Sequence, residues 1–104
     1  MKRVPLVLSD LAIADILEQA EWYGEQSGET LVKRWERAVT ATILRVIRNP
    51  DAGALCSFHN NELRHVRRAA IAGFSKHLLF YRLQGAKILI LRVLHGARDL
   101  ESIF

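Results

Sequence analysis

The side chains best suited to chemistry in this 104-residue chain are arginines and histidines, and most of them lie in residues 62–104. That part carries eight Lys/Arg against three Asp/Glu, whereas residues 1–61 carry seven against eight. Guanidinium groups beside imidazoles and a phenol can hold a phosphate backbone, or polarise a phosphodiester while a histidine or tyrosine moves a proton. The asymmetry therefore predicts an anionic partner, either nucleic acid or an acidic protein segment. The candidate target-binding residues are Arg64, Arg67, Arg68, Arg82, Arg92, His95 and Arg98.

Two structural roles compete with this interpretation of the arginines. They can form an ordinary solubilising surface that binds nothing in particular. Arg92 can also pair internally with Asp99 or Glu101 and so hold the C-terminal segment in place. The sequence leaves these alternatives open.

Metal, thiol and nucleotide chemistry find little support in the sequence. The four histidines have no i, i+4 pair on a predicted helix and no accompanying cysteine cluster, so neither a metal site nor a cofactor is predicted. Cys56 is the only cysteine, which excludes an internal disulfide and favours a reducing compartment. No glycine-rich phosphate loop is present.

Length and hydropathy predict one soluble domain over residues 1–104. Half of the residues are apolar and a quarter are charged, which is a globular composition. The first apolar stretch is interrupted by Pro5 and stopped by Ser9, so it is too short for a signal peptide. No run approaches the roughly 18–20 apolar residues that a membrane span needs. We expect a cytoplasmic protein with no membrane partner.

Hydrophobic periodicity predicts an α+β fold, in which an N-terminal strand and a two-helix hairpin pack on a C-terminal antiparallel sheet of three further strands. Ser9 and Asp10 can cap the first helix, and the short break at 27–29 makes the helices antiparallel neighbours. Nothing in the chain is expected to cover the other face of the sheet. The predicted strands are residues 3–8, 62–71, 75–83 and 87–95, the helices are residues 10–26 and 31–48, and residues 50–61 form an ordered loop.

A tight turn at Gln84-Gly85 predicts the register between the last two strands. Leu83 should then lie opposite Ala86, Phe80 opposite Leu89, and His77 opposite Arg92. In that register Arg82 shares one face with His95, while Arg92 shares the other with His77 and Tyr81. A slip of one residue would exchange these sets.

Three segments together resemble the RelE/ParE family of toxins from bacterial type II toxin–antitoxin modules: LR at 63–64, HLLFYRL at 77–83 and ILRVLHGARDLESIF at 90–104. The stretch LSDLAIADILEQAEWY is similar to the family's first helix, and NPDAG to the loop after the second. The resemblance covers nearly the whole chain. It implies a small basic toxin in a hetero-oligomer with a cognate antitoxin, whose C-terminal segment wraps the hairpin and the sheet. The antitoxin-binding residues expected on this basis are Ile16, Tyr23, Trp35, Leu79 and Tyr81.

The resemblance also implies two possible targets. RelE-like members cut messenger RNA on the ribosome, using an arginine three residues before the tyrosine of the FY strand and a tyrosine at the end of the C-terminal segment. Leu78 and Phe104 stand at those positions here, and neither can hold a phosphate or move a proton. If the protein is nonetheless a ribosome-dependent endoribonuclease, its candidate catalytic residues are Arg64, Arg82, His95 and Arg98.

The segment VLHGARD favours the ParE-like branch, whose members poison DNA gyrase and block replication. We therefore expect a non-enzymatic gyrase inhibitor that arrests growth and, in a plasmid setting, stabilises the plasmid. An inactive relative that only binds an antitoxin is a third possibility. The host, the antitoxin's identity and the stoichiometry of the complex do not follow from the sequence.

Overall fold

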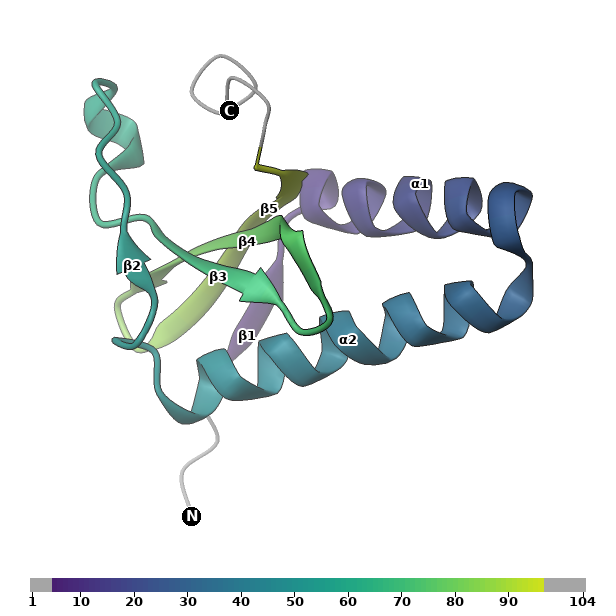
Figure 1. Ribbon diagram of the computed structural model, residues 1–104. Helices are drawn as coiled ribbons and strands as arrows, with labels where there is room; N and C mark the ends of the chain where they lie inside the picture. Colours follow the sequence, from purple (N-terminus) through teal and green to yellow (C-terminus); the bar gives the residue numbers. More distant parts are fainter. Residues whose placement is uncertain (1–4, 97–104) are drawn as a thin grey trace.

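A computed structural model describes residues 5–96, and its centre is a five-stranded sheet in the order β1-β5-β4-β3-β2. The hairpin of helices α1 and α2 lies beside this sheet (Figure 1). The α+β class is confirmed, but the sheet is mixed because β1 runs parallel to β5. The strands are β1 (Leu6–Leu8), β2 (Ala54–Leu55), β3 (Arg67–Ile71), β4 (Phe74–Gln84) and β5 (Lys87–His95), the helices are α1 (Asp10–Ser27) and α2 (Glu29–Arg48), and η1 (Asn61–Leu63) is a 3-10 helix.

Helix α1 begins at a serine cap, as predicted. The Ser9 hydroxyl accepts a hydrogen bond from the Ala12 amide at 3.0 Å and donates one to the Leu91 carbonyl of β5 at 2.7 Å. The cap therefore stabilises the first turn and also fixes it to the central strand. The helix ends before Gly28, whose φ of 83° suits glycine and turns the chain into α2.

Helix α2 packs on the sheet through an apolar stripe. Its buried side chains follow the three- and four-residue spacing that brings residues onto one helical face. Trp35 is completely buried, and its indole N–H donates to the Ile16 carbonyl of α1 at 3.1 Å. The indole therefore joins the two helices by packing and by a hydrogen bond. The buried residues of α2 are Trp35, Ala38, Val39, Thr42 and Val46.

Strand β3 is shorter than predicted. The sequence predicts a strand from Glu62, but residues 61–63 form η1, and His65 has a φ of 63°. A non-glycine residue in the left-handed region cannot continue a strand, so β3 begins only at Arg67. The predicted loop also contains a short strand, β2, which pairs with β3.

The predicted register between β4 and β5 is wrong. Gln84 pairs with Lys87, so the turn residues are Gly85 and Ala86. Each β4 residue up to the bulge therefore pairs two positions further along β5 than predicted, which leaves its side chain on the predicted face of the sheet. A bulge at Leu91 then adds one residue, which exchanges the faces beyond it.

Beyond the bulge, Phe80 pairs with Arg92 and His77 with His95. His95 therefore lies opposite His77, on the face that packs against the helices, rather than on the face of Arg82. The predicted sets, Arg82 with His95 and Arg92 with His77, do not form.

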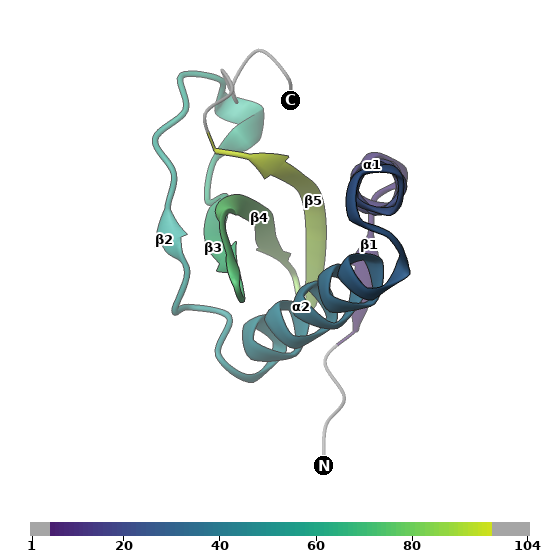
Figure 2. The same ribbon diagram turned by 45° about the vertical axis from the view of Figure 1, so that its right-hand side comes forward.

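The outer face of the sheet is covered in part by the protein's own connecting segment, contrary to the prediction. Val66, Phe80 and Leu94 are buried there, and Cys56 and Phe58 pack against them. The Phe58 and Phe80 rings lie 6.5 Å apart. Figure 2 shows the segment that contains β2 on the opposite side of the sheet from α1 and α2. No helix within residues 5–96 is long and apolar enough to cross a membrane.

Candidate functional site

The candidate target-binding arginines between residues 64 and 82 differ in how far they are engaged by their own chain. Arg64 and Arg68 are exposed. Arg82 is half-buried, and its guanidinium donates to the Glu62 carbonyl at 2.7 Å. Arg67 donates to the carbonyls of Asp51, at 3.0 Å, and Gly53, at 2.7 Å. Arg67 thus holds the loop after α2, while Arg64 and Arg68 present their charges to solvent.

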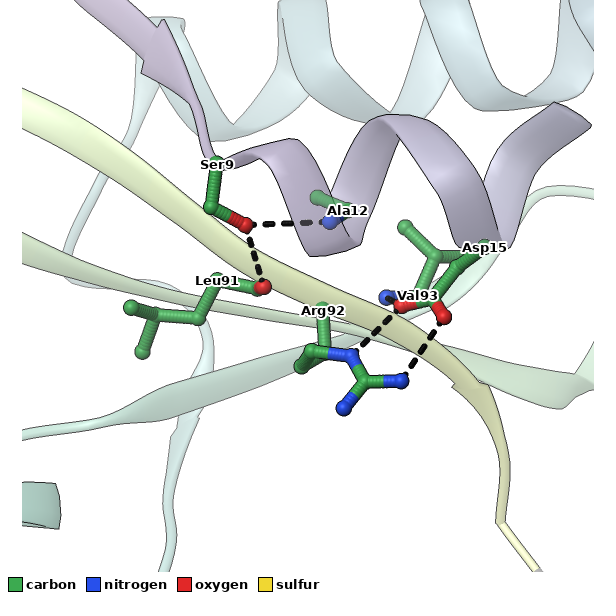
Figure 3. A network of polar contacts seen from close by, with 6 residues as sticks. All are labelled: Ser9, Ala12, Asp15, Leu91, Arg92 and Val93. Carbon is green, nitrogen blue, oxygen red and sulfur yellow. Dashed lines mark hydrogen bonds and ion pairs between the residues drawn. The ribbon is translucent and has the colours of Figure 1, made fainter. Parts of the chain in front are cut away.

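Arg92 has a structural role in the described chain. Its guanidinium donates two hydrogen bonds of 2.8 Å to the two carboxylate oxygens of Asp15 on α1 (Figure 3). The Val93 amide donates to the same carboxylate at 3.0 Å. The side chains are only 12% and 10% exposed, so this is a desolvated, bidentate ion pair. These hydrogen bonds to the Asp15 carboxylate raise the pKa of Arg92.

This ion pair corrects the prediction for Arg92. The residue cannot offer its charge to a target while Asp15 satisfies it. The sequence correctly allowed an internal pair but named Asp99 or Glu101 as the partner. Both of those residues lie outside the described chain.

The two histidines at the end of the β4–β5 ladder line a groove beside α1. The His77 and His95 rings lie 5.3 Å apart, and His77 also contacts Trp35 at 5.0 Å and Tyr23 at 6.4 Å between ring centroids. Burial among these rings, and then the charge of His95, lower the pKa of His77.

The groove itself measures about 790 Å³ and has walls of different chemistry. Acidic and aromatic side chains of α1 form one wall, and the start of β4 forms the other. Within residues 5–96, no group of three or more His, Cys, Asp and Glu side chains is placed to hold a metal ion. The residues that line the groove include Asp15, Glu18, Trp22, Tyr23, Phe74, Lys76, His77 and His95.

The comparison with known families decides the class of protein. A family model described as the ParE toxin of the type II toxin–antitoxin system parDE matches residues 6–100. The chain belongs to the ParE toxin family. The resemblance to this family seen in the sequence is therefore confirmed.

One solved structure shows the same fold as this ParE-family chain. It is described as the chromosomal ParDE TA system from P. aeruginosa and aligns with a TM-score of 0.73. The alignment covers 88% of this chain and 95% of the other, at 17% sequence identity. At that identity the likeness concerns the fold alone. Among curated proteins, none matches this sequence.

Two candidate nuclease residues of this ParE-family chain, Arg82 and His95, do not converge. Leu78, at the position where the resemblance to RelE-like members implies an arginine, packs in the outer-face cluster. Arg82 and His95 belong to opposite faces, and the pairing of His95 with His77 separates them by five positions along β4. Five strand positions correspond to about 17 Å. Arg98 and Phe104 lie outside the described residues.

Three of the five predicted antitoxin-binding residues are core residues. Trp35 and Leu79 are 0% exposed and Tyr81 is 1% exposed, so they present no surface to another chain in this structure. The prediction for these three is corrected: apolar side chains at helical and strand spacing are as typical of the core as of an interface. Ile16 and Tyr23 are half-buried, and Tyr23 lines the groove.

Sequence reasoning missed two groups of surface residues. The first group is apolar: Trp22 of α1, which lines the groove, is 53% exposed, and Leu17 of the same helix is 63% exposed. Four arginines of α2 lie outside the basic half of the sequence and were hidden in the balanced charge of residues 1–61. Charge counted for each predicted helix, rather than for each half of the chain, would have found the second group.

Proposed function

We propose that this ParE-family protein is the toxin of a type II toxin–antitoxin module and inhibits DNA gyrase in the cytoplasm. Family membership supports the toxin class. In this proposal a cognate antitoxin binds the toxin in a hetero-oligomer and neutralises it. The protein acts by binding and needs no cofactor.

The observation that supports this choice of target is the separation of two nuclease candidates, Arg82 and His95. Proton transfer requires the acid or base within about 3 Å of the group it serves. Arg82 lies on the outer face, whereas His95 lies in the groove among aromatic rings. Such a separation does not support a shared phosphodiester site, and it favours a toxin that blocks its target by contact.

The gyrase-binding surface in this proposal is the outer arginine face, defined as Arg64, Arg68 and Arg82. The first two are exposed, and the third keeps part of its guanidinium accessible. Exposed guanidinium groups bind carboxylates or phosphates bidentately. Arg98 belongs to the same predicted set but lies outside the described residues.

The antitoxin-binding surface in this proposal is the groove beside α1. Trp22 and Tyr23 offer an aromatic wall, and Glu18 adds negative charge. An apolar segment that also carries basic residues fits such a wall, because aromatic anchors supply binding energy while charge fixes register. Occupation of the groove would keep the toxin in an inactive complex.

The proposed function is tested by a supercoiling assay with purified gyrase and relaxed plasmid. We expect the full chain to inhibit supercoiling, and Arg64→Ala to weaken inhibition about tenfold while stability changes by less than about 1 kcal/mol. Lys87→Ala, which removes an exposed charge from the β4–β5 hairpin, serves as the control and should inhibit like the native chain. Induced cells should become filamentous and mount a DNA-damage response.

A parallel reaction with ribosome-bound messenger RNA separates the two targets. We expect no cleavage. Cleavage that disappears in His95→Ala, together with unimpaired gyrase, would show that the protein is a nuclease and that the gyrase proposal is wrong.

A further inference from the structure

Helix α2 carries a stripe of arginines that neither the family assignment nor the proposed gyrase contact uses. Its residues include five Lys/Arg and two Asp/Glu, a net charge of +3. At about 100° per residue, the four arginines and a small residue between them fall within an arc of about 80°. We call this surface the α2 arginine face, and its members are Arg34, Arg37, Ala41, Arg45 and Arg48.

The α2 arginine face points away from the core. All five of its residues are exposed, whereas Trp35, Val39 and Val46 on the other side of the helix are buried. Helix α2 forms one border of the molecule, with the sheet and α1 on its inner side (Figure 1). The ion pairs recorded in residues 5–96 involve none of these four arginines.

Helix stability explains only part of the stripe. Arg45 and Arg48 lie in the last turn, where cations favourably face the negative end of the helix dipole, and Arg45 also donates to the Ala70 carbonyl at 3.2 Å. Arg34 and Arg37 lie in the first half of α2, where the dipole gives a cation no advantage. Two exposed cations with no described ion pair therefore call for another explanation.

The shape and chemistry of the face suit a phosphate backbone. From Arg34 to Arg48 the helix rises about 21 Å, which is the length of about six base pairs of duplex DNA. Near its C-terminal end, Arg45 and Arg48 line a hollow of about 590 Å³ to which Arg68 also contributes. Guanidinium groups match phosphates bidentately, and the small Ala41 lets the backbone approach between them.

We propose that the α2 arginine face binds the phosphate backbone of duplex DNA without reading its sequence. Interfaces with DNA are strongly positive, whereas protein interfaces centre on buried apolar or aromatic anchors. The face has no aromatic residue, and the exposed Leu44 lies only at its margin. Single-stranded nucleic acid would require stacking aromatics, which the face also lacks.

The neighbouring helix restricts how DNA approaches. Helix α1 contains five Asp/Glu and no Lys/Arg, so it repels a polyanion. DNA therefore meets α2 from its outer side and leaves the groove beside α1 open. In this arrangement the toxin can hold DNA and another protein at the same time.

The test measures binding of the full chain, made by cell-free synthesis, to a fluorescent 20-base-pair duplex of arbitrary sequence. The variant Arg34→Gln/Arg37→Gln removes two charges that have no described structural bond. We expect about tenfold weaker binding at about 50 mM salt, and a slope of log affinity against log salt that is smaller by about 1.8. Thermal unfolding should show that the variant folds, since glutamine is a good helix former.

The charge-matched control is Lys87→Glu, which lowers the net charge by the same two units at an exposed position of the β4–β5 hairpin. It should bind DNA within about twofold of the native chain. Equal losses in both variants would overturn the proposal, because they would show attraction by net charge alone. Binding to polyglutamate but not to DNA would also overturn it, in favour of an acidic protein partner. The assay contains no gyrase, so its result is independent of the proposed gyrase inhibition.

Discussion

The two helices of the hairpin are neighbours in sequence and in space, yet they are held by different forces. Helix α2 buries five side chains, whereas α1 buries only Ala12. Helix α1 instead makes polar contacts at fixed points: the Ser9 hydroxyl with Leu91, and the Asp15 carboxylate with Arg92. Helix α2 is therefore fixed mainly by apolar packing, whereas α1 combines a smaller apolar contact, through Ile16, Ala20 and Tyr23, with hydrogen bonds and charge.

This difference determines which helix can offer an apolar surface to a partner. Because polar contacts hold α1, several of its large apolar side chains remain exposed, including Leu11, Leu17 and Trp22. Helix α2 uses its apolar side chains in the core and exposes arginines. The hairpin thus presents an acidic and apolar surface on one helix and a basic surface on the other, which suits two different partners.

The largest expected effect contrasts the two tryptophans. Trp35→Ala should lower the free energy of unfolding by about 3–5 kcal/mol, because it leaves a cavity and removes the hydrogen bond to Ile16. Trp22→Ala, at an exposed position of α1, should change it by less than about 1 kcal/mol. Urea denaturation of both variants measures the contrast. Equal losses would mean that α1 is fixed by apolar packing after all.

A smaller effect is expected from the ion pair that fixes α1. Asp15→Ala leaves the buried Arg92 guanidinium and the Val93 amide without this acceptor, which should cost about 3 kcal/mol. Lys33→Ala breaks the exposed pair with Glu29 on α2 and should cost less than about 0.5 kcal/mol. Replacing both partners, as Asp15→Leu/Arg92→Met, should recover part of the loss. A double variant that is no more stable than Asp15→Ala would contradict this account of the pair.

The sequence predicted the helices and strands better than the register in which β4 and β5 pair. Caps and hydrophobic spacing are local signals, so Ser9, both helices and the apolar strand β5 were predicted correctly. The bulge at Leu91 lies where Ser9 and Asp15 bond to the backbone of Leu91 and Val93, and contacts so distant in sequence leave no local signal. One extra residue was enough to move His95 to the other face.

The sequence predicted which residue types the candidate site contains, but not how those residues are arranged. The outer cations Arg64 and Arg68 are exposed as a target-binding role requires. Arg92 is engaged by Asp15, a partner 77 residues away that no spacing rule could name. Trp35, Leu79 and Tyr81 illustrate the same limit, since helical or strand spacing marks a buried face without telling whether the chain itself or a partner buries it.

The smallest expected effect is a pH dependence at His77, where the two helices meet. Its ring contacts Tyr23 of α1 and Trp35 of α2, and Asp15, Glu18, Lys76 and His95 share the groove. Burial, and then His95, lower the pKa of His77 in the folded chain below its unfolded value of about 6.5. The unfolded chain therefore binds the proton more readily, so the stabilising contribution is complete above about pH 6.5 and is lost as the pH falls through the folded pKa.

His77→Gln removes this titrating group, and urea denaturation between about pH 7.5 and 5 measures the consequence. The native chain should lose stability more steeply than the variant as the pH falls below about 6.5. His59→Gln, in the exposed loop, is the control and should follow the native curve. Parallel curves for the native chain and His77→Gln would show that the meeting point of the helices tolerates the charge. Any loss of stability at low pH would then have another origin, such as the contact of Asp15 with Arg92 and Val93 of β5.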